Sequence, residues 1–328
     1  MILAGDVGAT KILLEVGEFR SDRWQTKLGR RYATTEVDSF STLLTTFLGE
    51  WNQVRGKGER ITGAGFGVAG AAIGNKIKMT HRPITVDGDA IRERFLIPEV
   101  AVVNDLAAAA RGLDVLGPRD LVTIQAGKAV PEAPRVVLGI GTGLGVAYLI
   151  PRGDGFDIVP GEGGHAGFAP ATVAQSQLWQ SIFQRHGRVS AEDVVSGTGL
   201  GNIAHFTSGG SFVEAATADA LLERAATDEA ASSALDLFVE CLGSVAGDHA
   251  LAVIARGGVY LMGGVIARVY ERIRDGRFSE AFCAKGVHSA AMMKIPVKAV
   301  TNERLALLGA AKLVLYALAD RSLRKGVE

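Results

Sequence analysis

Short apolar runs that end in glycine dominate the pattern of this chain. Residues 2–4, 136–140 and 259–262 are almost wholly apolar, and two or more glycines follow or close each run. Apolar runs of this length, bounded by turn residues, favour buried strands. Glycine turns lack Cβ atoms, so their backbone N–H groups can converge on phosphate oxygens. Three such turns predict that one polyphosphate is held from several sides.

Between these turns the apolar spacing predicts an alternating α/β order that occurs twice. In the first half we expect strands at residues 2–4, 12–16, 28–34, 61–68 and 100–103, and helices at 40–54, 89–95 and 106–113. The second half has strands at 136–149 (a hairpin), 156–159, 259–262 and 295–300, and helices at 173–186, 265–274 and 303–319, with further helices inserted. The pattern predicts two related domains of β-β-β-α-β-α-β-α order with a cleft between them. We expect a smaller domain of residues 1–108 with 303–328 and a larger one of residues 109–302.

Composition narrows the class of ligand. The 328 residues carry 35 Lys and Arg against 35 Asp and Glu, so no basic excess favours nucleic acid or anionic lipid. Cys241 and Cys283 are isolated, which indicates neither a zinc motif nor a disulfide framework. The uncharged stretch 136–151 is too short to span a membrane, and the first glycine turn leaves no room for a signal peptide. We expect a cytoplasmic protein whose partners are small molecules or a second subunit.

The first two glycine turns each join two strands. A Walker P-loop or a dinucleotide fingerprint would have to open a helix, so neither is predicted. In the first turn, Gly8 and Thr10 are candidates for contact with phosphate, and Asp6 for a place near Mg²⁺. An ordinary hairpin turn explains these residues equally well. In the second turn, Thr142 and Gly143 are candidates for a facing phosphate clamp, which the repetition favours over mere close packing.

Asn104 and Asp105 stand where a predicted strand meets a predicted helix. The carboxyl end of a strand in an open α/β sheet is a common ligand site, but Asn or Asp in this place is also an ordinary helix cap. A cap needs one such residue, which leaves the second to face the cleft.

Residues 160–170 hold Glu162 and His165 among glycines, between two prolines. Carboxylate and imidazole together suit the neighbouring hydroxyls of a sugar, and no further zinc ligands lie near. Glu192 is interpreted as a carboxylate at a helix start. Gly263 and Gly264 fit an adenine or ribose site about as well as plain packing of strand against helix. His186, His205, His249 and His288 have no partners at ligand spacing and are interpreted as structural or exposed.

Taken together these segments resemble the bacterial glucokinase family. The likeness is carried by Leu-Ala-Gly-Asp-Val-Gly-Ala-Thr at 3–10, Val-Val-Asn-Asp-Leu at 102–106, Gly-Thr-Gly-Leu-Gly-Val-Ala at 141–147, Pro-Gly-Glu-Gly-Gly-His at 160–165 and Val-Ser-Ala-Glu at 189–192. Related repressor-and-kinase (ROK) sugar kinases carry a Cys-rich zinc motif that this chain lacks. The resemblance is therefore to the zinc-free members of the hexokinase–actin–Hsp70 superfamily. It implies two ribonuclease-H-like (actin-like ATPase) domains and a homodimer.

The resemblance also implies a role for each candidate residue. Asp105 would take the proton from the 6-hydroxyl of glucose, and Asp6 would orient Mg²⁺ through water. The other sugar hydroxyls would be held by Asn104, Glu162, His165 and Glu192. The ATP phosphates would be flanked by Gly8, Thr10, Lys11, Thr142 and Gly143, and the adenosine by Gly263 and Gly264.

Two departures from the family pattern bear on the sugar. Residues 80–84 read Thr-His-Arg-Pro-Ile where Thr-Asn-x-Pro-Trp is usual, and Ala9 and Lys11 replace frequent Gly and Asn. Glucose phosphorylation by ATP is the expected activity, and a kinase for mannose, fructose or an N-acetylated hexosamine is the nearest alternative. A sugar-sensing homologue is disfavoured by the retained Asp105 and by a start without a helix-turn-helix. A general ATPase would leave the Glu162 and His165 loop without a purpose.

Overall fold

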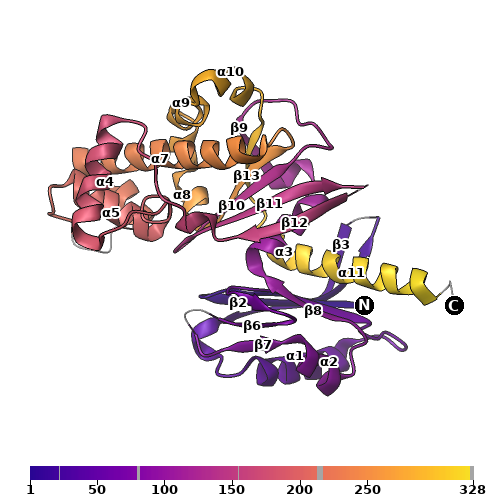
Figure 1. Ribbon diagram of the computed structural model, residues 1–328. Helices are drawn as coiled ribbons and strands as arrows, with labels where there is room; N and C mark the ends of the chain where they lie inside the picture. Colours follow the sequence, from indigo (N-terminus) through magenta and orange to yellow (C-terminus); the bar gives the residue numbers. More distant parts are fainter. Residues whose placement is uncertain (22, 80–81, 154, 213–216, 326–328) are drawn as a thin grey trace. The chain divides into compact units, whose positions relative to one another are not determined.

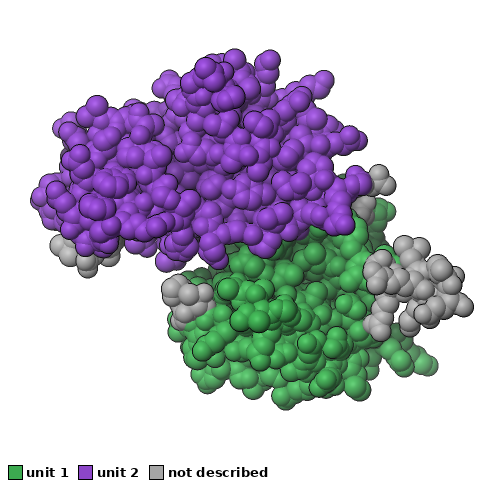
Figure 2. Space-filling model, viewed as in Figure 1, with its two compact units in different colours: residues 1–117, 302–328 green, residues 118–301 purple. Residues whose placement is uncertain are grey.

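The computed structural model describes residues 1–21, 23–79, 82–153, 155–212 and 217–325. They form two compact units, each described by itself: unit 1 is Met1–Gly117 with Asn302–Glu328, and unit 2 is Pro118–Thr301 (Figures 1 and 2). The predicted break after residue 108 would cut the helix α3 (Asp105–Gly112), which packs on α11 (Leu305–Lys325) within unit 1. The boundary therefore lies farther along the chain than the sequence indicated.

Unit 1 contains a five-stranded sheet in the order β3-β2-β1-β4-β8. Its strands are β1 (Ile2–Val7), β2 (Lys11–Arg20), β3 (Arg23–Ala33), β4 (Gly63–Val68) and β8 (Val100–Asn104). β1, β2 and β3 form an antiparallel meander, whereas β1, β4 and β8 run parallel. Because β1 is central and buried on both faces, its sequence is an apolar run rather than an alternating one.

Helices cover both faces of this sheet (Figure 1). Leu3 and Val7 of β1 lie in one core with α1 (Phe40–Val54) and α2 (Gly88–Phe95), whereas Ile2 and Ala4 lie in another core with α11. The α1 helix has the predicted bounds, and Ser39 caps it by accepting a hydrogen bond from the Thr42 N–H. A small sheet of β5 (Ala72–Ile73), β6 (Lys76–Lys78) and β7 (Thr85–Asp87) was not predicted from the sequence.

Unit 2 contains a six-stranded sheet in the order β12-β11-β10-β13-β14-β9. Its strands are β9 (Leu121–Gln125), β10 (Arg135–Ile140), β11 (Leu144–Arg152), β12 (Gly155–Gly161), β13 (Gly258–Met262) and β14 (Val297–Val300). The first five strands in this order repeat the arrangement of unit 1, with three antiparallel strands followed by parallel neighbours. β9, which the sequence did not predict, is added antiparallel at the edge. Both units are thus mixed α/β structures.

The helices of unit 2 pack around one large core. They are α4 (Val173–His186), α5 (Gly197–Thr207), α6 (Ala218–Arg224), α7 (Glu229–Val253), α8 (Gly264–Ile273), α9 (Arg277–Cys283) and α10 (Ser289–Met292). Among the described residues, α7 alone is long and apolar enough to cross a membrane, but 72% of its most apolar window is buried inside unit 2. Burial of this extent is what a core helix shows.

Close packing of α11 on α3 depends on Gly309. A Cβ atom at this position would lie 1.7 Å from the carbonyl oxygen of Ala108. We expect Gly309→Ala to lower the free energy of unfolding by about 2–3 kcal/mol, because the two helices must move apart. Gly49→Ala in α1 is the matched control, since its added Cβ meets nothing within 4 Å. It should stabilise the protein by up to about 1 kcal/mol through helix propensity. Urea denaturation of both variants measures the change in the free energy of unfolding. A change of the same sign in the two variants would contradict this account.

Candidate active site

Two acidic residues lie at one edge of the unit 1 sheet. The register pairs Asp6 of β1 with Gly67 of β4, and Gly67 with Val103 of β8, so Asp6 and Asp105 are separated by one strand. Gly67 has no side chain to fill the space between them, and a Cβ there would lie 2.8 Å from the Ala108 Cβ. The carboxyl ends of three parallel strands therefore bring the two predicted acids together.

Asn104 is the cap of α3. Its Oδ1 accepts hydrogen bonds from the N–H groups of Leu106 and Ala107 at 2.9 and 3.2 Å, and its Nδ2 donates to the Gly70 carbonyl at 3.1 Å. Asp105 is the first residue of the helix, and its Oδ1 accepts from the Leu106 N–H at 2.9 Å. Asn104 is thus the helix cap, a role that the sequence could assign to either residue. The Leu106 N–H orients the Asp105 carboxylate.

Burial makes both carboxyl groups poor acids. It raises the pKa of Asp6 to about 7, helped by the negative charge of Asp105 and opposed by the positive charge of Lys11. Burial also raises the pKa of Asp105, opposed by the hydrogen bond from the Leu106 N–H. A carboxylate with a raised pKa is a stronger base than one in water, which suits proton transfer near neutral pH.

The first glycine turn adjoins this pair. The Gly8 N–H donates to the Lys11 carbonyl at 2.9 Å, and Thr34 Oγ1 donates to the Gly8 carbonyl at 2.8 Å. Thr10 at the tip of the turn is exposed. The Lys11 ammonium forms an ion pair at 3.1 Å with Glu303, which lies two residues before α11. The turn therefore presents backbone and hydroxyl groups, while the predicted phosphate ligand Lys11 already has a carboxylate partner.

The other two glycine turns lie together in unit 2. β10 and β13 are parallel and pair Gly139 with Met262, so the turn at residues 141–143 and the start of α8 share one edge of the sheet. Gly263 has a φ of +110°, and a Cβ there would lie 2.1 Å from the Ile140 carbonyl oxygen. Only glycine fits this position. Gly264 then begins α8, whose first N–H groups point away from the helix as they do in anion sites.

Glu162 and His165 lie on a short loop of unit 2. Their side chains are 82% and 62% exposed, and Oε2 of Glu162 is 4.0 Å from Nε2 of His165. The main chain beneath them is ordered: Gly163–His165 is a 3-10 turn in which the His165 N–H donates to the Glu162 carbonyl at 3.0 Å. The Ala191 and Glu192 N–H groups donate to the Ala166 and Gly164 carbonyls, both at 2.8 Å. The side chains of Glu162 and His165 are therefore exposed to solvent, whereas the main chain that carries them is held by hydrogen bonds.

Glu192 links this loop to the second glycine turn. Its Oε2 accepts from the Leu144 N–H at 2.7 Å, and a Cβ on Gly143 would lie 2.4 Å from the same oxygen. The sequence indicated a helix start, which is wrong: Glu192 lies in a turn, and α5 begins only at Gly197. Its contact with Leu144 joins residues 48 positions apart, so no local sequence pattern predicts it.

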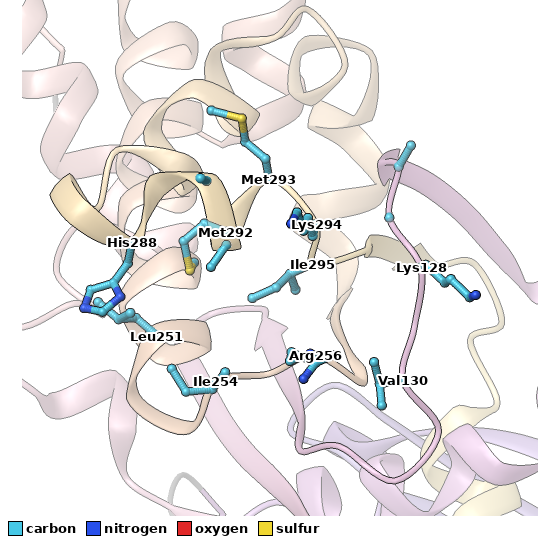
Figure 3. Close-up of a pocket in the computed structure, with 14 residues that line it drawn as sticks. Lys128, Val130, Leu251, Ile254, Arg256, His288, Met292, Met293, Lys294 and Ile295 are labelled. Atoms are coloured by element: carbon cyan, nitrogen blue, oxygen red, sulfur yellow. The ribbon is translucent and has the colours of Figure 1, made fainter.

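The predicted site residues thus form one group in each unit. Thr80 and His81 of the segment that departs from the family pattern lie outside the described residues. A pocket of about 920 Å³ opens elsewhere in unit 2, between the ends of β9 and α7 and the segment around α10, and none of the predicted site residues line it. In Figure 3, Met292 and Ile295 turn toward its interior and Lys128 extends away from it. The pocket lies beside Gln125 and Val297, which pair at the amino end of β14. It is therefore at the edge of the unit 2 sheet opposite the one that holds Gly263.

Comparison with known proteins gives one consistent result. A family model described as glucokinase matches residues 3–317. A glucokinase of Nostoc sp. is 31% identical, over 95% of this chain and 98% of that protein. The crystal structure of a glucokinase from an Antarctic psychrotroph has a TM-score of 0.85 at 27% identity, covering 96% of this chain and 98% of that one. A ROK family glucokinase from Streptomyces griseus, solved with glucose and AMPPNP, shares the fold with a TM-score of 0.62 at 20% identity, covering 96% and 99% of the two chains. The chain belongs to the glucokinase family.

Proposed function

We propose that this protein transfers the γ-phosphoryl group of ATP to the 6-hydroxyl of glucose. The observation that carries the proposal is the Asp105 carboxylate, half-buried at the start of α3 beside a second acid, in a chain of the glucokinase family. Burial raises its pKa, so it accepts a proton more readily than an exposed carboxylate does.

The reaction needs few groups from the protein. Phosphoryl transfer depends on in-line positioning, charge neutralisation and a residue that orients the nucleophile. In our proposal the 6-hydroxyl oxygen forms the new bond to the γ-phosphorus, the bond to the leaving ADP oxygen breaks, and the hydroxyl proton passes to an oxygen of Asp105. The hydrogen bond from Leu106 to Oδ1 fixes the carboxylate for this transfer.

We infer that the exposed side chains of Glu162 and His165 bind sugar hydroxyls, and that Asn104 and Glu192 contribute to the same binding. Asn104 and Glu192 have fewer hydrogen-bonding groups left for a sugar than Glu162 and His165 have. Both Asn104 Oδ1 and one hydrogen of its amide are engaged within unit 1, and Glu192 Oε2 holds the Leu144 N–H. Asn104 can thus offer its second amide hydrogen and Glu192 its second oxygen.

We infer that the phosphates of ATP approach the turn at Gly8, whose own N–H stays bonded to the Lys11 carbonyl, and contact the backbone of Gly143 and the hydroxyls of Thr10 and Thr142. Lys11 would have to exchange its partner Glu303 for a phosphate oxygen. Gly263 and Gly264 would lie by the adenosine, at the start of α8. A protein of this fold binds both glucose and AMPPNP, which supports the choice of ligands.

Mg²⁺ fits the acids of unit 1. Magnesium sites in kinases use one or two carboxylates together with waters and substrate phosphates. Asp6 is a half-buried carboxylate whose charge is disfavoured by partial burial and by Asp105, so a nearby cation would stabilise its ionised form. We propose that Asp6 holds the ion through water, and that the bound ion would neutralise charge on the phosphates.

We further infer that both units are ribonuclease-H-like domains of the actin-like ATPase kind. The matching order of their first five strands supports this. A homodimer in the cytoplasm is the assembly and location that we propose from the family.

The substrate is tested by coupled ADP release from the purified protein. We expect ATP turnover to require added sugar and to be fastest with glucose among glucose, mannose, fructose and N-acetylglucosamine. Phosphorus NMR of the product should show the phosphate on the 6-position. Turnover that is unchanged without sugar would refute a sugar kinase, and a higher kcat/KM for another hexose would reassign the substrate.

A further inference from the structure

The loop that carries Glu162 and His165 rests on a polar pair from elsewhere in unit 2. Tyr148 of β11 and His249 of α7 are joined by a hydrogen bond of 2.8 Å between the tyrosine hydroxyl and Nδ1. The His249 ring lies directly under the loop: a Cβ built on Gly163 would be 2.9 Å from its Cε1 atom. The ring therefore occupies the space beside Gly163 that any other residue would need.

The exposed side chains of Glu162 and His165 make no close contact that would fix their positions. Glu162 and His165 approach each other only to 4.0 Å and are mostly surrounded by solvent. Their geometry is set by the main chain, which is held on one side by hydrogen bonds from Ala191 and Glu192. On the other side it packs against His249 and against Val146, whose Cβ would also be 2.9 Å from a Gly163 Cβ.

We propose that Tyr148 and His249 are positioning residues for sugar binding, which hold the main chain between Glu162 and His165 in its binding geometry. The inference rests on the proposed sugar site and adds two residues that lie in its support rather than in contact with the ligand. A fixed loop binds more tightly because less conformational freedom is lost when the sugar arrives.

The electrostatics of the pair agree with a structural contact at neutral pH. Burial lowers the pKa of His249, opposed by the neighbouring Asp248, and so favours the neutral ring that can exchange a hydrogen bond with Tyr148. Burial also raises the pKa of Tyr148, which keeps its hydroxyl protonated.

Two variants separate the two contacts. Tyr148→Phe keeps the ring and removes the hydrogen bond, whereas His249→Asn keeps a polar atom near the Nδ1 position and removes the ring beneath Gly163. We expect each to raise the KM for glucose by about tenfold, the effect of losing one positioning contact, with kcat and the KM for ATP changed less than threefold. Tyr270→Phe is the matched control, because its buried hydroxyl has no hydrogen-bond partner among the described residues. Its kinetics should equal those of the parent.

Amide hydrogen exchange of residues 162–166 supplies a readout that does not depend on catalysis. We expect faster exchange in Tyr148→Phe and His249→Asn than in the parent and in Tyr270→Phe. Parent-like exchange together with a parent-like glucose KM would overturn the inference. A parent protein that releases no ADP with any sugar would instead overturn the proposed function, while the exchange result would still report whether the pair holds the loop.

Discussion

Asp105→Asn is expected to lower kcat for glucose phosphorylation by about 10³-fold. The amide has nearly the shape of the carboxylate and can still accept the hydrogen bond from the Leu106 N–H, so α3 should begin as before. It cannot accept the proton of the sugar hydroxyl, and only the acceleration due to positioning would remain. Because ground-state contacts change little, the KM for ATP should stay within about threefold of its parent value.

Asp89→Asn is the control for this prediction. Asp89 lies in the first turn of α2, another helix of eight residues in unit 1, and it is exposed and paired with Arg92. Its kinetics should not change. ADP release and circular dichroism of both variants separate loss of chemistry from loss of fold. If folded Asp105→Asn protein keeps kcat within tenfold of the parent, another group takes the proton.

Local patterns predicted the elements whose signals are complete within a few residues. The α1 helix has apolar residues on one face and a serine cap, and its bounds were predicted as found. Asn104 and Asp105 were correctly placed at the end of a strand, and the structure decides which of them is the cap. The three glycine turns follow buried strands because the parallel strands that precede them are covered on both faces.

Elements fixed by distant pairing could not be predicted in this way. β9 is an edge strand whose partner β14 is more than 170 residues away in the chain, and β5, β6 and β7 are too short to show a pattern. Glu192 reaches Leu144 through the fold alone.

Strand β4 carries a sequence signal of close packing. Strand β4 has glycine at positions 63, 65 and 67, each on the same face. Cβ atoms there would meet Val314, the Ala310 carbonyl oxygen and Ala108, at 2.3, 2.1 and 2.8 Å. Alternating glycines in a strand indicate that a backbone approaches closely. Here that close approach of α11 and α3 also leaves the space between Asp6 and Asp105.

Asp6→Asn is expected to stabilise the protein in alkaline solution and to impair catalysis. The folded-state pKa of Asp6 is about 7, whereas the unfolded value is near 3.8. Between these values the folded state holds one more proton than the unfolded state, so this group lowers the free energy of unfolding as the pH rises. The loss is complete above pH 7 and amounts to about 2–4 kcal/mol, which an uncharged asparagine avoids.

Urea denaturation at about pH 4 and pH 8.5, without nucleotide or Mg²⁺, measures this effect. The variant and the parent should be nearly equal in stability at the lower pH, and the variant should be more stable at the higher pH. In an Asp105→Asn background the gain should shrink but persist, because burial is the larger cause of the shift and the charge of Asp105 the smaller one. The same variant should need about tenfold more Mg²⁺ for half-maximal ATP turnover, since it loses the negative charge that would hold the hydrated ion. A variant that is no more stable at pH 8.5 would show that Asp6 ionises without cost, and unchanged Mg²⁺ dependence would remove it from the metal site.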